Sequence, residues 1–133
     1  MDMSSYQDKN EALQKVLRSM MENLPQIELA AVVSMEGLPI THFPEQLPEG
    51  VDNTRVAAMT AAMSSLGERA MMEVGRSDLL RIFVEGEDGY LISVTAGTKA
   101  VLTVSARKPI KLGLIFFDIK TASKDIGDIL DNP

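Results

Sequence analysis

The chain has no cysteine and a single histidine among its 133 residues. Without thiols it can form no disulfide, and it has neither a thiol nucleophile nor a thiolate metal ligand. The lone histidine, His42, has no second histidine or cysteine with which to build a zinc site or a catalytic pair. We therefore expect no metal and no cofactor, and we interpret His42 as a surface residue of a strand.

Positive charge and long apolar runs are also scarce. Lysine and arginine number 13 against 19 acidic residues, which gives a net charge of −6 and a pI near 4.7. Nucleic-acid binding needs a basic field, so this balance argues against a nucleic-acid partner. No apolar run is long enough to cross a membrane, and residues 1–5 lack the pattern of a secretory signal. These absences predict a cytoplasmic protein.

The most informative stretch that is present runs from Asp52 to Gly75 and reads as a helix. Asp52 or Thr54 can cap its first free N–H groups, its interior holds helix-favouring residues without proline, and Gly75 can end it in a left-handed conformation. At 1.5 Å per residue the helix would be about 35 Å long.

This helix avoids charge on both sides, because Arg55 is the only charged residue between Asn53 and Gly67. A helix that is apolar or small all round is buried on more than one side, and small side chains let a second backbone approach. We infer that one face covers the chain's own sheet and the other contacts a second subunit. The alternative is an alanine-rich surface helix. The stripe expected to cover the core is Val56, Met59, Met63, Leu66, Ala70 and Val74, and the small side is Ala58, Ala61, Ala62 and Ser65.

The remaining elements follow from periodicity and turn signals. A capping box at Asp8–Glu11 opens an amphipathic helix that Pro25 stops, and the Asp-Gly turn at 86–89 marks a hairpin. Phe117 lies on the polar side of the last helix and needs no special explanation. Strands are predicted over 27–35, 38–43, 79–85, 90–95 and 100–105, and the last helix runs from Pro109 or Ile110 to Leu130. The apolar stripe of the first helix is Leu13, Val16, Leu17, Met20 and Leu24, and that of the last is Leu112, Ile115, Phe116, Ile119, Ala122, Ile126 and Leu130.

The predicted order is α-β-β-α-β-β-β-α. Strands that are apolar on both faces must be covered on both, so we expect an α+β fold of three α/β/α layers around a five-stranded antiparallel sheet.

Motifs that carry chemistry are missing. There is no Gly-x-Ser-x-Gly nucleophile elbow, and Gly97-Thr98-Lys99 lacks the upstream glycine and following hydroxyl of a phosphate loop. The acidic residues Glu85, Glu87 and Asp88 lack calcium-loop spacing and are interpreted as a solvated hairpin tip. We predict that the protein is not an enzyme.

Four segments, in this order and spacing, carry a family resemblance: AAVVSMEGLPI at 30–40, the helix entry and body at 52–69, VEGEDGY at 84–90 and LGL at 112–114. Through them the chain resembles the Roadblock/LC7 family from about Asn10 to Leu130. The resemblance implies one domain over residues 8–131 after a flexible N-terminus at 1–7. It also implies that the middle helix covers one sheet face and that the two terminal helices cover the other.

The resemblance further implies a homodimer, in which strand 79–85 pairs with its twin and the middle helices pack together. Such pairing would also protect an apolar edge strand from aggregation. The implied interface residues are Ala58, Ala61, Ala62, Ser65, Arg69, Leu80, Ile82 and Val84.

Members of the family typically act as non-enzymatic scaffolds for Ras-like small GTPases, and this implies a regulatory scaffold here. Two other hypotheses stay open: a structural adaptor in a larger cytoplasmic motor or signalling assembly, and an enzyme or small-ligand sensor. Stimulated nucleotide hydrolysis would separate the scaffold from the adaptor, and a ligand-induced melting shift would favour the sensor. The implied GTPase-binding residues are Pro48, Glu49, Asp52, Arg55 and Glu73.

Overall fold

The computed structural model describes residues 3–132, with side chains from residue 7. Its element order is the predicted one. The elements are α1 (Met3–Asn23), β1 (Ile27–Ser34), β2 (Pro39–Phe43), α2 (Asn53–Glu73), β3 (Arg81–Glu85), β4 (Gly89–Ala96), β5 (Ala100–Arg107) and α3 (Leu112–Asp131).

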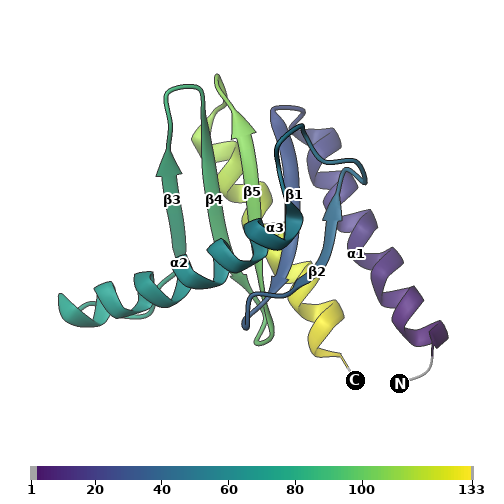
Figure 1. The fold of residues 1–133 in the computed structure, drawn as a ribbon, viewed down its shortest axis with the longest axis horizontal. Coiled ribbons are helices and arrows are strands. Elements are labelled where there is room, and N and C mark those ends of the chain that lie inside the picture. The colour runs from purple at the N-terminus through teal and green to yellow at the C-terminus, as the bar shows by residue number, and fades with distance from the viewer. Residues whose placement is uncertain (1–2, 133) are drawn as a thin grey trace.

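The five strands form one antiparallel sheet in the order β2-β1-β5-β4-β3, so β2 and β3 are the edges. Pro39 begins the edge strand β2 beside a register shift in β1, a position at which a sheet tolerates proline. α2 crosses one face of the sheet, and α1 and α3 cover the other (Figure 1). The three-layer α+β fold is therefore confirmed.

The main core lies between the sheet and the pair α1 and α3. The stripes predicted for the two terminal helices face it, with Leu13 and Leu17 from α1 and Ile115, Ile119 and Ile126 from α3 almost completely buried. They meet apolar side chains on alternate positions of three strands: Ala30, Val32, Ile92, Leu102 and Val104.

α1 begins earlier than predicted. It starts at Met3, so the expected capping box at Asp8–Glu11 lies inside the helix rather than at its start. Residues 1 and 2 lie outside the described residues, and the flexibility of segment 1–7 stays a prediction.

α2 packs on the sheet through small residues, which corrects the predicted stripe. Ala57 and Thr60 are completely or almost completely buried, and Ala57 packs on Ala31 and Val33 of β1. Of the predicted core residues, Val56 and Met63 are half-buried, whereas Met59, Leu66, Ala70 and Val74 are exposed.

The physical reason is that the face beneath α2 leaves little depth for long side chains. The hydroxyls of Ser93 and Thr103 share a buried hydrogen bond there, 2.5 Å between oxygens, and a methyl group on Gly67 would lie 3.1 Å from the Leu79 side chain. Small residues at helical spacing let the helix backbone approach this surface, and larger ones would hold it away.

Both predicted ends of α2 are confirmed. The Asp52 side chain accepts a hydrogen bond from the Thr54 amide at 2.9 Å, which caps the helix. Gly75 has φ of +70°, and the amides of Gly75 and Arg76 donate to the carbonyls of Met72 and Met71. This pair of bonds is the Schellman ending that glycine favours.

The β4–β5 turn is fixed against α3 by two glycines. A methyl group on Gly127 would lie 2.6 Å from the backbone nitrogen of Gly97, and Thr98 donates two hydrogen bonds to the Asp131 carboxylate. The turn therefore tolerates no side chain at position 127.

We expect Gly127→Ala to lower the free energy of unfolding by about 1–3 kcal/mol, because overpacking would displace the turn. The matched control is Gly113→Ala in the same helix, where a methyl group meets nothing within 4 Å. That variant should instead gain roughly 0.5 kcal/mol. Urea midpoints that move in the same direction for both variants would contradict this packing.

Candidate protein-binding surface

Within residues 3–132 no group of three or more His, Asp or Glu side chains is arranged to hold a metal ion. His42 is half-buried on β2, where its Nδ1 shares a hydrogen bond with the Pro44 carbonyl oxygen at 2.8 Å. No helix in the described part of the chain is both long and apolar enough to span a bilayer. The candidate sites are therefore surfaces that could bind another protein.

The outer side of α2 is apolar although it faces solvent. Met59 is 53% exposed and Leu66 is 69% exposed. Large apolar side chains that gather on one exposed face mark interaction sites more often than scattered ones do. We call this surface the outer α2 face and define it by Ala58, Met59, Ala62, Ser65, Leu66 and Arg69.

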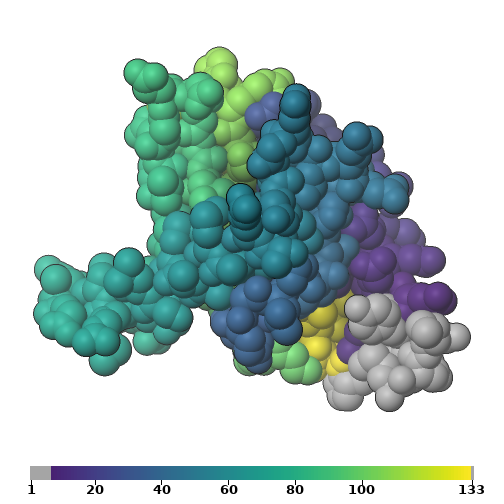
Figure 2. Space-filling view, viewed as in Figure 1, coloured from purple at the N-terminus to yellow at the C-terminus, as the bar shows by residue number. Residues whose placement is uncertain are grey.

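The C-terminal part of α2 extends past the sheet. Figure 1 shows the helix leaving the sheet beyond β3, and Figure 2 shows its end standing clear of the rest of the molecule. Gly67 is the position that contacts Leu79 and approaches Ile82, and beyond it Met72 and Val74 are strongly exposed. Within the described part of one chain, no other segment covers this end of the helix.

β3 is an edge strand with apolar side chains. It pairs with β4 alone in the described part of the chain, and Phe83 and Val84 are exposed. At its end Lys108 donates a 2.6 Å hydrogen bond to Glu85, and this bond raises the pKa of the Lys108 ammonium. An apolar edge of this kind is a template for pairing with another strand.

The predicted interface residues fall into two groups. Exposed positions are Ala58, Ala62, Ser65 and Arg69 on the outer α2 face, with Leu80 and Val84 at the β3 edge. The two others, Ala61 and Ile82, are half-buried within the chain. Ala61 faces Gly37, because a methyl group added to Gly37 would lie 3.2 Å from the Ala61 Cβ, and Ile82 lies near Gly67. Leu80 also lines a groove together with α3 residues.

The predicted GTPase-binding residues do not form one patch in a single chain. Pro48 and Glu49 lie exposed in the loop before α2, next to Asp52, which is 3.7 Å from Arg55. Glu73 is exposed at the opposite end of α2, about 30 Å away along the helix axis.

These features define a small α/β/α domain with an apolar helix face and an open sheet edge. The chain belongs to the Roadblock/LC7 family, because the model of the Roadblock/LC7 domain matches residues 13–106.

The chain is also similar to a curated protein and to solved structures. An uncharacterized protein of Methanocaldococcus jannaschii, MJ0714, is 38% identical over 95 residues, which cover 71% of this chain and 77% of that protein. The gliding protein MglB of Thermus thermophilus has a similar fold, with a TM-score of 0.84, 18% identity and coverage of 94% and 93% of the two chains. An MglB with a tetrameric arrangement also has a TM-score of 0.84, at 18% identity and coverage of 92% and 90%.

Asp52 caps α2, so its substitution would change stability as well as any binding. We expect Asp52→Ala to lower the free energy of unfolding by about 1 kcal/mol because it removes the cap. Asp52→Asn keeps an oxygen that can accept from the Thr54 amide and should retain most of that stability, as chemical denaturation would show. If both variants lost the same amount, the stabilisation would come from the carboxylate charge at the helix N-terminus rather than from the hydrogen bond to the Thr54 amide.

Proposed function

We propose that the chain forms a homodimer through α2 and β3, and that this dimer is a non-enzymatic regulatory scaffold for a Ras-like small GTPase. The main support for the dimer is that one chain has both an overhanging helix and an uncovered area of sheet, which a second copy could match. At one end of β3, α2 extends beyond the sheet, and at the other end of β3 no helix of the described chain covers this face of the sheet (Figure 1).

A two-fold axis beside β3 would join these two features. α2 passes β3 near Ile82, at the start of the strand. Val84 and its β4 partner Leu91 lie at the other end, and both are at least partly exposed. If two β3 edges paired antiparallel, the start of one strand would lie beside the end of the other. The free end of each α2 would then cover the partner's Val84 and Leu91.

The same arrangement would bury the outer α2 face. The two helices would run antiparallel across the axis with Ala62 and Ser65 near their contact, where small residues permit a close approach. The apolar Met59 and Leu66 would leave solvent, which is favourable by about 25 cal/mol per Å² of apolar area buried. The tetrameric arrangement described for an MglB of similar fold supports the assembly of this fold into oligomers.

The GTPase platform would need both chains. In the antiparallel pair Glu73 would lie alongside the N-terminal half of the partner's α2, closer to Asp52 of the partner subunit than to its own. The charged groups around Asp52 and Arg55 would then border a surface that neither chain completes alone. Membership of the Roadblock/LC7 family and the likeness to a gliding protein support a regulatory partner of this kind.

Ala62→Arg tests the dimer. It would place an unpaired charge in the helix contact, so we expect a loss of several kcal/mol of dimer stability from an interface of roughly 1,200–2,000 Å². The variant should elute as the 14.5 kDa single chain and melt at a lower temperature than the parent. The matched control is Thr121→Arg on the exposed side of α3, which should leave both properties unchanged. Parent-like behaviour of Ala62→Arg would show that the interface lies elsewhere.

Arg55→Glu tests the platform. We would measure binding of a small GTPase purified from the same cells, loaded either with a GTP analogue or with GDP, to the parent dimer. Binding should depend on the nucleotide, and Arg55→Glu should weaken it about tenfold, which corresponds to 1.4 kcal/mol. Equal binding in both nucleotide states, with no effect on hydrolysis, would favour the structural adaptor instead.

A further inference from the structure

A groove of about 260 Å³ lies between the start of β3 and α3, on the sheet face opposite α2. It is lined by Leu80 and Arg81 before and at the start of β3, by Val94 of β4, and by Phe116, Ile119 and Lys120 of α3. Of the residues that line the groove, only Leu80 also belongs to the implied dimer interface.

The floor of the groove is apolar, and its rim carries an exposed apolar side chain. Ile119 is almost completely buried, and Val94 and Phe116 are half-buried against the main core. Leu80 at the rim is 80% exposed. A cavity of this size suits a single large side chain better than a drug-sized ligand, because pockets for such ligands start at about 300 Å³.

The rim is positively charged although the whole chain is negative. The Arg81 guanidinium lies 4.4 Å from the centre of the Phe116 ring, a favourable cation–π distance. Within residues 3–132 neither Arg81 nor Lys120 has a carboxylate at ion-pair distance, and no lining residue is acidic.

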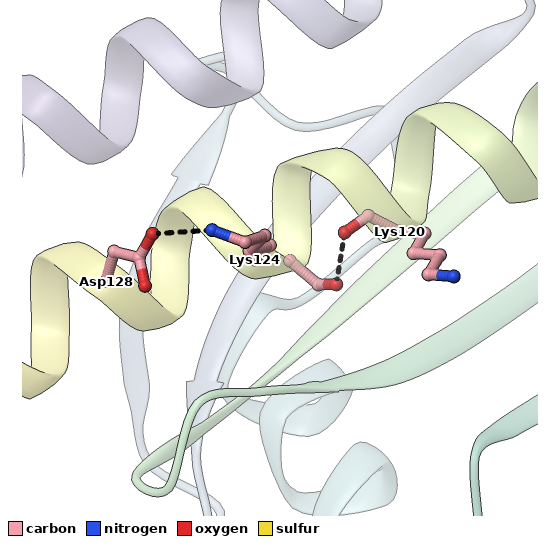
Figure 3. Close-up of polar contacts among 4 residues, drawn as sticks. Lys120, Lys124 and Asp128 are labelled. Atoms are coloured by element: carbon pink, nitrogen blue, oxygen red, sulfur yellow. Dashed lines mark hydrogen bonds and ion pairs between the residues drawn. The ribbon is translucent and has the colours of Figure 1, made fainter.

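Neighbouring lysines differ in this respect. One turn further along α3, Lys124 forms a 3.2 Å ion pair with Asp128, whereas the Lys120 side chain extends away from that pair (Figure 3). Lys108, whose ammonium lies 5.0 Å from the centre of the Tyr90 ring, is paired with Glu85. Of these neighbouring cations, Arg81 and Lys120 are the two without a carboxylate at ion-pair distance among the described residues, so both can bind an external anion.

We propose that this groove binds an acidic peptide segment of a partner protein, with one large apolar side chain in the groove and flanking carboxylates at Arg81 and Lys120. A guanidinium can hold a carboxylate through two parallel hydrogen bonds, and the ammonium of Lys120 supplies a second point of attachment. The scaffold would thus carry a second partner on the face opposite α2.

Peptide display on phage against the full chain tests this proposal. Enriched peptides should carry Asp or Glu beside Leu, Ile, Met or Phe. One enriched peptide is then synthesised and its affinity for each protein variant is measured. It should bind Lys120→Glu about tenfold more weakly than the parent and bind Lys124→Glu about as tightly as the parent. Both substitutions reverse the same charge on one helix, so net charge is matched, and Lys124→Glu also removes the ion pair with Asp128 and is therefore the more demanding control for folding.

Three outcomes would overturn the proposal. The first is enrichment of neutral or basic peptides, and the second is a selected peptide that binds Lys120→Glu as tightly as the parent. The third is no enrichment of any peptide. This third outcome would count against the proposal even if octanoate, a small apolar carboxylate, shifted the amide resonances of Val94 and Phe116. The same measurement on Ala62→Arg separates this groove from the dimer surface. Peptide binding that survives in that variant would uphold the groove even if the dimer proposal failed.

Discussion

The close approach of α2 to the sheet is the constraint on which the surface of this protein depends. Ala57, Thr60 and Gly67 lie against a face that carries a buried Ser93–Thr103 hydrogen bond. Since only small residues fit between helix and sheet, the larger apolar residues of α2 are turned to solvent. A single chain therefore buries one side of its middle helix and exposes the more hydrophobic one, the reverse of the usual amphipathic arrangement.

Two other features lie on the same side of the molecule as this exposed face. α2 extends past β3, and β3 itself is an unpaired edge with apolar side chains. A single two-fold contact would bury the outer α2 face, the free end of α2 and the β3 edge together. It would also bring the charged residues at both ends of α2 into a shared platform. The groove beside α3 lies on the opposite face, so a GTPase and an acidic peptide could occupy the scaffold together without competing.

Periodicity and turn chemistry predicted the element order, both caps of α2, and the core stripes of α1 and α3. They failed for the sheet-facing side of α2, because its small residues at 57, 60, 64 and 67 share the helical spacing of the larger ones. Hydrophobicity favoured the larger stripe, whereas the depth available above the sheet selected the smaller one. The groove was missed because it joins Arg81 to Lys120, which are distant in sequence, and the GTPase site rested on family resemblance alone.

The mass of the unmodified chain in solution, determined by sedimentation equilibrium at micromolar concentration, tests the central claim most directly. Because the outer α2 face and the β3 edge would both be buried by a second copy, we expect a stable particle of twice 14.5 kDa that persists on dilution. A single species of 14.5 kDa across the concentration range would contradict the two-fold contact, and with it the platform proposed to span two chains.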